Sequence, residues 1–280
     1  MKLEDIRIRD PFILPYDGTY YMYGSRMEEG KPAFWVYRSV DLAEWSEPQK
    51  VFAPPEDFWA DRDFWAPEVH MYKNRFYMFA SFKAENRCRG TQILVCDSPD
   101  GMFVPLTKNP VTPSDWECLD GTLYIDRNNK PHIVFCHEWF QIGDGTVCEM
   151  MLSDDLTTAV SAPRVLWKAS DYEDVIDAAG EVESKVTDGP FLYRPEDGRL
   201  LCIWSSFNKN GYAELVSESS NGDIDGEWTV NKKPLFKRNG GHGMIFRTFR
   251  GETMFVMHSP NESPLERAVL YKLDEISDFE

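Results

Sequence analysis

Three aspartates in this 280-residue chain, Asp10, Asp120 and Asp188, each stand immediately before a Pro or Gly and a short apolar run. A single Asp in that context is usually a turn residue that accepts hydrogen bonds from backbone N–H groups. Three at the same position of a repeat favour a functional role, because crowded carboxylates repel one another and their pKa values split. Cleavage of a glycosidic bond needs such a pair, an acid to protonate the leaving oxygen and a carboxylate to activate water or attack the sugar.

The aspartates belong to a repeat that organises the chain. Each repeat opens with a short polar or small residue and continues with an apolar strand of about five residues. A turn rich in Gly, Asn and Asp follows, and a second strand rich in aromatic residues closes the unit. Apolar runs separated by such turns predict β-hairpins. The repeat occurs at residues 10–25, 66–81, 120–137, 188–206 and 242–259.

Shorter apolar runs between the hairpins predict third strands, such as 267–275, and weaker fourth strands, such as 234–238. Four-stranded units of about 40–55 residues are typical of β-propeller blades. The sequence therefore predicts an all-β, five-bladed β-propeller with four-stranded antiparallel blades, in a single domain over residues 1–280. A β-sandwich or barrel is the alternative, but five near-even periods account for almost all of the chain.

Two segments lie outside the regular repeat. Residues 171–186 lengthen the third period and predict a helical turn or a rim loop, and residues 6–9 could supply the outer strand of the fifth blade. In a propeller the first strand of each blade lines the central channel, so the first residues of the repeats meet at one mouth. The residues expected around that opening are Asp10, Ala66, Asp120, Asp188 and His242.

At these positions the chain resembles glycoside hydrolase family 43, the arabinofuranosidase, xylosidase and arabinanase group. The resemblance covers nearly the whole chain, with its motifs in order and at blade spacing. It implies a five-bladed propeller that hydrolyses arabinose- or xylose-containing plant glycans or oligosaccharides with inversion and without an organic cofactor. The motifs are Asp-Pro-Phe at 10–12, Trp-Ala-Pro at 65–67, Leu-Asp-Gly-Thr at 119–122, Asp-Gly-Pro at 188–190 and Gly-His-Gly at 241–243.

The resemblance implies a role for each aspartate. Asp10 would be the general base that deprotonates water, Asp120 would orient the acid and tune its pKa, and the acid would come from position 188. Inversion requires the base and acid carboxyls to stand about 6.5–9.5 Å apart, which leaves room for the water. The chain departs from the family at this last position, where the family usually has Glu and this chain has the shorter Asp188.

Two other carboxylates could supply the proton if Asp188 falls short. We favour Asp188 as the acid, with Glu138 as the second choice, because Glu138 follows a strand in a Cys-His-Glu-Trp-Phe run rich in reactive and aromatic residues. A rim position paired with a nearby Arg is the alternative interpretation of Glu138. Glu68, in the Ala-Pro-Glu of the second repeat, is the other carboxylate that could reach in.

Aromatic and histidine side chains near the strand ends are candidates for substrate binding. Trp65 and Trp139 could stack on the C–H face of a sugar, as could Trp59 and Phe64. His70 and His137 could bond sugar hydroxyls, although each is more often a structural histidine. The resemblance also implies that His242 faces the axis and contacts an ion or its water shell, often Ca²⁺. Because calcium prefers oxygen ligands, His242 would more plausibly hold a coordinated water.

The composition limits the partners and the compartment. A formal net charge of −17 repels nucleic acid and anionic membranes but is compatible with a neutral oligosaccharide or polysaccharide. No apolar run is long enough to span a membrane. The start lacks an apolar signal-peptide core, which favours a cytoplasmic protein, or a secreted one if a signal was removed. The six cysteines show no CxxC pair, so we expect no structural disulfide and no zinc site. Nothing in the sequence indicates the oligomeric state.

Two other functions remain open. A related propeller phosphorylase would need a basic anion pocket, and Arg87 with Arg89 is the only tight basic pair near a blade-two loop. A non-catalytic glycan-binding propeller would account for the departure at Asp188.

Overall fold

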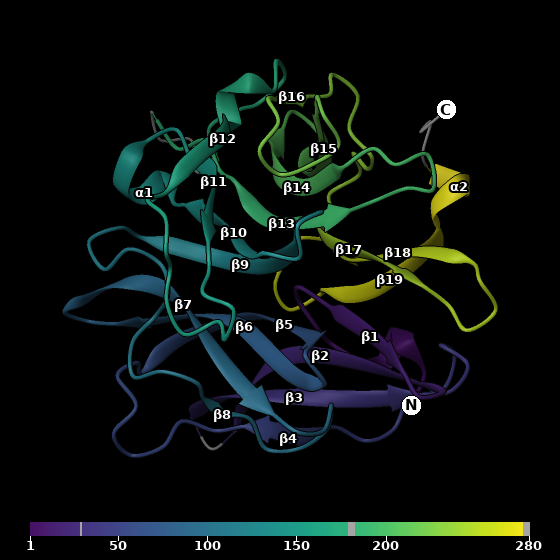
Figure 1. Cartoon of the computed structure of the whole chain (residues 1–280). Helices are drawn as coiled ribbons and strands as arrows, with labels where there is room; N and C mark the ends of the chain where they lie inside the picture. The colour runs from purple at the N-terminus through teal and green to yellow at the C-terminus, as the bar shows by residue number, and fades with distance from the viewer. Residues whose placement is uncertain (29, 179–182, 277–280) are drawn as a thin grey trace.

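The computed structural model describes residues 1–28, 30–178 and 183–276, and within them the chain forms five antiparallel sheets around a central axis (Figure 1). The predicted five-bladed propeller is therefore confirmed. Blades 1 and 2 consist of β1 (Phe12–Tyr16), β2 (Thr19–Glu28), β3 (Lys31–Ser39), β4 (Gln49–Phe52), β5 (Arg62–Tyr72), β6 (Arg75–Ala84), β7 (Arg87–Cys96) and β8 (Val104–Pro105).

The remaining blades follow in chain order. Blades 3 and 4 consist of β9 (Cys118–Ile125), β10 (Pro131–His137), β11 (Thr146–Met151), β12 (Arg164–Lys168), β13 (Asp188–Tyr193), β14 (Leu201–Asn208), β15 (Gly211–Ser219) and β16 (Trp228–Val230). Blade 5 consists of β17 (Gly241–Arg247), β18 (Thr253–Ser259) and β19 (Arg267–Lys272). The short helices are α1 (Trp139–Ile142), α2 (Leu273–Ile276) and the 3₁₀ turns Leu3–Asp5 and Ala169–Asp171.

The hairpin turns follow the sequence signals that predict them. Asp17 and Gly18 between β1 and β2 both have positive φ, at 46° and 75°, as do Lys73 and Asn74 between β5 and β6, at 46° and 63°. Two consecutive left-handed residues are the pattern of a type I′ turn, whose twist matches that of the paired strands. The Asp-Gly and Lys-Asn dipeptides therefore set the register of these hairpins.

Apolar side chains fill the spaces between neighbouring blades. One cluster joins blades 2 and 3 through Phe79 and Phe135, and a second joins blades 3 and 4 through Trp167 and Trp204. Further clusters lie between blades 4 and 5 and around blades 1, 2 and 5. Each large side chain buried in this way stabilises the fold by about 1.5–3 kcal/mol. The blades are held in a ring mainly by these contacts between sheets.

The structure differs from the predicted strands in two blades. Blade 5 has three strands within the described residues, with the predicted run 267–275 forming β19 and α2. The outer edge of β19 is contacted by the N-terminal segment, through a bridge between Arg7 and Arg267 and a hydrogen bond from Ile8 N to Glu266 O. In blade 4 the fourth strand is β16. The predicted run 234–238 forms an isolated bridge instead of a strand, between Phe236 and Glu214.

The predicted insertion is a rim segment with little regular structure. After the 3₁₀ turn at Ala169–Asp171, the described residues up to 186 form turns and one bridge, between Lys185 and Asp144. Residues 179–182 of the insertion lie outside the described residues.

A β-bulge at the start of the first strand recurs in blades 2 to 5. In each of these blades the pairing between the first and second strands shifts, and a residue in the shifted stretch has positive φ. Asp10 has the same conformation just before β1. The residues with positive φ at these positions are Asp10 (50°), Ala66 (45°), Asp120 (55°), Gly189 (51°) and His242 (51°).

This pattern corrects the predicted alignment of the repeats in blade 4. The residue of blade 4 that is equivalent to Asp120 and His242 is Gly189. Asp188 lies one position earlier and is equivalent to Leu119 of blade 3 and Gly241 of blade 5. A side chain one position earlier on a strand leaves the backbone in a different direction. Asp188 therefore enters the central opening from a different angle than Asp10 and Asp120.

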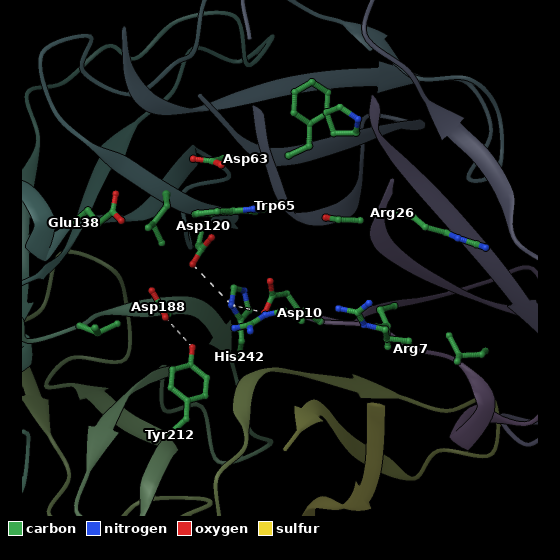
Figure 2. Close-up of a pocket in the computed structure, with 18 of the residues that line it drawn as sticks. Arg7, Asp10, Arg26, Asp63, Trp65, Asp120, Glu138, Asp188, Tyr212 and His242 are labelled. Carbon is green, nitrogen blue, oxygen red and sulfur yellow. Dashed lines mark hydrogen bonds and ion pairs between the residues drawn. The ribbon is translucent and has the colours of Figure 1, made fainter. Parts of the chain in front are cut away.

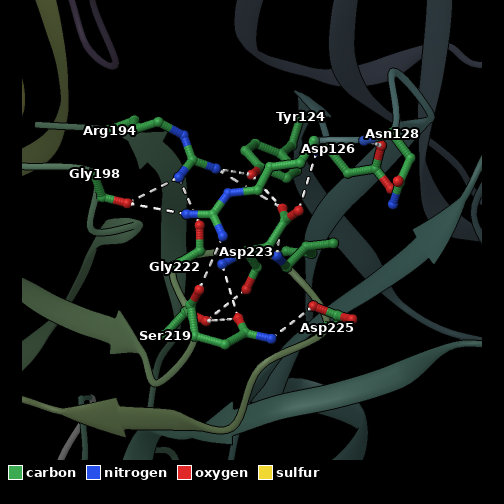
Figure 3. Close-up of polar contacts among 12 residues, drawn as sticks. Tyr124, Asp126, Asn128, Arg194, Gly198, Ser219, Gly222, Asp223 and Asp225 are labelled. Atoms are coloured by element: carbon green, nitrogen blue, oxygen red, sulfur yellow. Dashed lines mark hydrogen bonds and ion pairs between the residues drawn. The ribbon is translucent and has the colours of Figure 1, made fainter.

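A polar network joins blades 3 and 4 near the ends of their first strands, β9 and β13 (Figure 3). The carboxylate of Asp223 accepts hydrogen bonds from the hydroxyl of Tyr124 at 2.6 Å and from the backbone N–H of Arg127 at 3.1 Å. The guanidinium of Arg194 donates to the Tyr124 hydroxyl at 2.5 Å and to the carbonyl of Gly222 at 2.6 Å. Asp223 is thus a buried carboxylate on which groups from both blades depend.

Replacing Asp223 by Ala is expected to lower the free energy of unfolding by about 3 kcal/mol, because it leaves several buried donors without their acceptor. Denaturant unfolding followed by tryptophan fluorescence measures the loss. The matched control is Asp225→Ala, since Asp225 is exposed and accepts only from the Asn221 amide at 2.9 Å; its effect should stay within about 0.5 kcal/mol. Equal effects of the two substitutions would contradict the importance of the network.

The structure also bears on membrane spans and on the cysteines. Within the described ranges, no helix is long and apolar enough to cross a membrane. All six cysteines are free thiols, and Cys118, Cys136, Cys148 and Cys202 are buried.

Candidate active site

A groove of about 1160 Å³ crosses the face of the propeller on which the first strands begin. All five blades and the N-terminal segment contribute to its walls, and the three aspartates singled out by the sequence lie at its centre (Figure 2). Residues far apart in the chain therefore share one solvent-accessible space, as the repeat predicts. The groove residues named in Figure 2 are Arg7, Asp10, Arg26, Asp63, Trp65, Asp120, Glu138, Asp188, Tyr212 and His242.

Asp10 lies between two histidines of blade 5. Its Oδ1 atom is 3.1 Å from Nδ1 of His242 and 3.2 Å from Nδ1 of His258. Its backbone N–H also donates to Nδ1 of His258 at 3.3 Å, and Nε2 of His258 lies 3.1 Å from Oδ1 of Asn261. A single Nδ1 accepts from the backbone N–H of Asp10 when it is unprotonated and donates to the carboxylate when it is protonated, so the completely buried His258 holds Asp10 in place in either form.

Asp120 is buried deeper and is held by hydrogen bonds from neighbouring blades. Its Oδ2 accepts from the backbone N–H of Gly189 at 3.1 Å, and its own backbone N–H donates to Oγ of Ser81 at 2.8 Å. Gly189 has a φ of 51°, and a Cβ atom at this position would stand 2.5 Å from the His242 ring. Glycine is therefore required both for the backbone conformation and for the close approach of the imidazole.

Asp188 has a different environment from the other two aspartates. Its Oδ2 accepts a hydrogen bond of 2.9 Å from the hydroxyl of Tyr212, a buried side chain on β15. The Tyr212 ring stacks on His258 with centroids 5.7 Å apart. The two aspartates at opposite ends of this stack, Asp10 and Asp188, are therefore positioned by one pair of packed rings.

The electrostatic environments of Asp10 and Asp188 push their pKa values apart. Burial favours the neutral form of Asp10, but the charge of His242 and the hydrogen bond from His258 outweigh it and hold the pKa of Asp10 well below its usual range. Burial and the negative charge of Asp120 raise the pKa of Asp188 to about 7, against the opposing effects of His242 and Tyr212. Asp10 is thus a carboxylate at neutral pH, while Asp188 can hold a proton there.

Asp120 and His242 complete the charge balance. Burial raises the pKa of Asp120, and the nearby charge of Asp10 adds to this effect although His242 opposes it. Burial alone would lower the pKa of His242, but the carboxylates of Asp10, Asp120 and Asp188 raise it to about 9. His242 is therefore an imidazolium at neutral pH and the principal counter-charge of the cluster.

Glu138 lies in the same groove but is paired with an arginine. Its carboxylate makes an ion pair with Nη1 of Arg89, whose Nη2 lies 2.7 Å from Oδ2 of Asp63. The Arg89 guanidinium also stacks over the Trp65 ring at 4.3 Å. Burial raises the pKa of Glu138 above its usual value. Arg89 opposes this rise, and the negative charge of Asp188 adds to it. The pairing with Arg89 matches the alternative interpretation made from the sequence.

The structure brings together some of the predicted substrate-binding residues and not others. Trp65, Trp139 and Phe64 line the groove. His70 lies outside its lining and is 3.1 Å from the Glu68 carboxylate, with its ring packed against Phe12.

His137 and Trp59 also lie outside the lining of the groove. His137 is stacked on Trp116 at 4.2 Å and bonded to Gln141 at 2.8 Å, and Trp59 donates to Gln92 at 3.0 Å. These contacts give both side chains structural partners away from the aspartates.

A small cavity of about 10 Å³ lies beneath His242, lined among others by Asp10, Ala66, Glu68 and Gly243. Its size leaves room for about one water molecule. No group of three or more His, Cys, Asp or Glu side chains suited to a metal ion occurs in the described part of the chain. The residues here therefore do not fit the six to eight oxygen ligands of Ca²⁺ without several waters. An axial calcium ion remains a prediction.

Sequence reasoning missed two groups of residues in the site. Tyr212 lies on β15, the third strand of blade 4, and His258 lies on β18, the second strand of blade 5, where an apolar run gives no sign that a polar tip faces an aspartate. Arg7, Arg9 and Arg26 line the groove from the N-terminal segment and β2. Their spacing carries no motif, although the alternation of residues 6–9 could have indicated that Arg7 and Arg9 share one face.

Known proteins match this chain over most of its length. A family model described as glycosyl hydrolases family 43 matches residues 5–275. Among solved structures, an endo-arabinase from Bacteroides thetaiotaomicron VPI-5482 is 39% identical, with a TM-score of 0.92, and the match covers 97% of this chain and 96% of that one. A thermostable family-43 glycoside hydrolase is 21% identical, with a TM-score of 0.80 over 95% of this chain and 89% of that one, and shares the fold.

Two curated proteins match over shorter stretches. An extracellular exo-α-(1→5)-L-arabinofuranosidase of Cellvibrio japonicus (strain Ueda107) is 22% identical over 218 residues, which cover 69% of this chain and 57% of that protein. A xylosidase/arabinosidase of Bacteroides ovatus is 27% identical over 136 residues, which cover 41% of this chain and 42% of that protein. The chain thus spans about half the length of the curated relatives it matches.

Proposed function

The chain belongs to glycosyl hydrolases family 43, and on that premise we propose that it hydrolyses glycosidic bonds in arabinose- or xylose-containing plant glycans or oligosaccharides, with inversion at the anomeric carbon. The observation that carries the proposal is the contrast between Asp10 and Asp188, two carboxyls in one groove whose pKa values are shifted in opposite directions. That contrast is what an acid and a base working in the same reaction need.

In the proposed mechanism Asp10 is the general base. It stays ionised because of His242 and His258, and it takes a proton from a water molecule that attacks the anomeric carbon. Asp188 is the general acid and gives its proton to the leaving oxygen, while the Tyr212 hydroxyl holds the carboxyl in place and stabilises the carboxylate that results. Asp120 keeps the proton on Asp188 through its negative charge.

Asp188 is a better candidate for the acid than Glu138. Burial raises the pKa of Glu138, but its carboxylate makes an ion pair with Arg89, which opposes that rise and favours the ionised form that cannot donate a proton. Among the described contacts, Asp188 has only the Tyr212 hydroxyl as a side-chain hydrogen-bond donor.

A direct test uses nitrophenyl α-L-arabinofuranoside and nitrophenyl β-xyloside, with and without inorganic phosphate. Hydrolysis that does not depend on phosphate, with the inverted anomer as the first product by NMR, supports the proposal. Turnover that requires phosphate would indicate a phosphorylase, and binding without turnover would indicate a glycan-binding propeller. The phosphorylase has little support at Arg87 and Arg89, because Arg89 is already paired with two carboxylates and Arg87 lies over Trp59.

The pH dependence of kcat/KM should reflect the two shifted groups. The base is active above its lowered pKa, and the acid is active below its raised pKa of about 7. We therefore expect a plateau on the acidic side and a fall of about tenfold per pH unit above about pH 7. Initial rates on a nitrophenyl glycoside between about pH 4 and about pH 9 measure this profile. Activity that instead rises between about pH 6 and about pH 8 would contradict the assignment of a protonated Asp188.

The compartment is part of the proposal. Six free cysteines are compatible with a reducing cytoplasm, which the sequence favours. The relative from Cellvibrio japonicus is described as extracellular, which favours the secreted alternative. Fractionation of the native host with an antibody against the protein distinguishes the two.

A further inference from the structure

The groove is electrically uneven along its length. Figure 2 shows Arg7 and Arg26 on one side of Asp10, and Asp188 with Glu138 on the other. Arg9 lines the same groove. In a chain whose formal net charge is −17, three arginines in the wall of one groove form a local basic region. We call Arg7, Arg9 and Arg26 the arginine arm.

The arginines of the N-terminal segment are held in place but are not fully neutralised. Nε of Arg7 lies 3.6 Å from Oε2 of Glu266, and Nη1 of Arg9 lies 3.3 Å from Oε1 of the same carboxylate. Glu266 is almost completely buried, so one fixed carboxylate serves two guanidinium groups. Neutral acceptors supply the other contacts, Ser263 to Arg7 at 3.0 Å and Asn261 to Arg9 at 2.8 Å. This pair therefore keeps about one positive charge that Glu266 does not cancel.

Arg26 adds a second charge from blade 1. Its guanidinium lies over the Trp35 ring at 5.5 Å and is hydrogen-bonded to the side chain of Tyr37. Both contacts leave the charge in place, and the residue is exposed to the groove. A guanidinium with free donors favours carboxylate, which it can bind through two parallel hydrogen bonds. A neutral sugar hydroxyl offers no comparable gain.

We propose that the arginine arm is a subsite for a uronic acid unit, so that the enzyme prefers glycans in which an arabinose or xylose chain carries a carboxylate-bearing sugar. The inference rests on the proposed function, since it assumes that a glycan occupies the groove. Arg9 is close enough to Asp10 and Asp188 for their charges to act on it, so the acidic unit binds near the cleaved bond. The arginine arm then selects a decorated substrate and sets its register over the aspartates.

The test compares two ligands that differ only in the carboxylate. One is a xylo- or arabino-oligosaccharide bearing one glucuronic acid, and the other is its carboxyl-reduced counterpart, with CH₂OH in place of COO⁻. Binding is measured by calorimetry on the Asp188→Asn variant, which should turn over too slowly to consume either ligand. The titrations are run at about pH 6, where this substitution removes little charge because the pKa of Asp188 is raised to about 7. The acidic ligand should bind roughly tenfold more tightly at low salt, and the ratio should fall toward one in high salt.

Arg7→Gln and Arg26→Gln, each in the Asp188→Asn background, should reduce that ratio, while Arg75→Gln should preserve it. Arg75 is the matched control because it is an exposed arginine on β6, paired with Asp97 at 2.6 Å and outside the groove lining. Arg9 is left unchanged, since it makes the closer contact with the buried Glu266, a hydrogen bond of 3.3 Å against an ion-pair distance of 3.6 Å for Arg7. Equal affinity for the two ligands, or an unchanged ratio in both arginine variants, would overturn the proposal.

Two further measurements distinguish a uronate subsite from a phosphate site and from a failure of the proposed function. Inorganic phosphate at matched ionic strength should neither displace the acidic ligand nor accelerate turnover; if it does both, the arginine arm is a phosphate site and the uronate proposal is wrong. Hydrolysis of the neutral nitrophenyl glycosides by the wild-type protein tests the proposed function separately. If the neutral glycosides are not hydrolysed but the acidic ligand still binds more tightly than its reduced counterpart, the proposed hydrolase function is wrong and the carboxylate subsite is still supported.

Discussion

Asp10→Asn should lower kcat/KM for hydrolysis by about 10²–10⁴-fold, the contribution of a general base, while the protein stays folded. The amide cannot accept the proton of the attacking water. It also removes the negative charge that faces His242 at 3.1 Å and His258 at 3.2 Å. The expected rate loss is measured on nitrophenyl α-L-arabinofuranoside or β-xyloside, and circular dichroism with thermal melting reports on the fold.

The control for this substitution comes from the same blade. Asp17→Asn makes the same chemical change at another residue with positive φ, 46° against 50° for Asp10, in the turn between β1 and β2. Asparagine tolerates this backbone conformation as well as aspartate does. The control should keep near wild-type activity. If Asp10→Asn also retains near wild-type rates, Asp10 has no part in the mechanism.

Asp188→Asn and Glu138→Gln should differ in how their effects depend on the leaving group. A substrate with a poor leaving group needs full protonation, so loss of the acid should reduce its rate by about 10²–10⁴-fold. A dinitrophenyl glycoside needs little protonation and should lose far less. We expect this contrast for Asp188→Asn, because Asp188 has a pKa raised to about 7 and, unlike Glu138, no cationic partner at hydrogen-bond distance among its described contacts.

Glu138→Gln should reduce both rates by a similar and smaller factor. Its amide can still accept a hydrogen bond but cannot form the ion pair with Arg89, so the guanidinium that stacks on Trp65 at 4.3 Å loses one of its two carboxylate partners. The expected defect is in substrate positioning, seen mainly in KM. The comparison needs kcat and KM for both variants on both substrates. A strong dependence on the leaving group for Glu138→Gln, and none for Asp188→Asn, would transfer the role of acid to Glu138.

Much of the fold could be predicted because the signals are local. Turn dipeptides such as Asp17-Gly18 and the alternation of apolar residues specify hairpins, and their regular recurrence specifies blades. Strand β16 and the single bridge of Phe236 could not be predicted in this way, because outer strands are short and pair only where the neighbouring chain allows it.

The site was predictable only as far as the repeat could position it. The repeat correctly brought Asp10, Asp120 and Asp188 to one groove, but it aligned Asp188 with the others by residue type. The bulge that makes Gly189 equivalent to Asp120 and His242 depends on the backbone conformation, which the residue types do not predict. Likewise, the contact between Tyr212 and Asp188 joins two strands whose facing sides are decided by packing between blades.

Closure of the ring by the N-terminal segment has a consequence for synthesis of the protein. Arg7 is translated well before its bridging partner Arg267. The segment must therefore wait, unpaired, until the fifth blade has emerged. Asp10 follows this segment directly and relies on His258 of that same blade. A nascent chain thus completes the surroundings of Asp10, the proposed general base, only when these two segments have met.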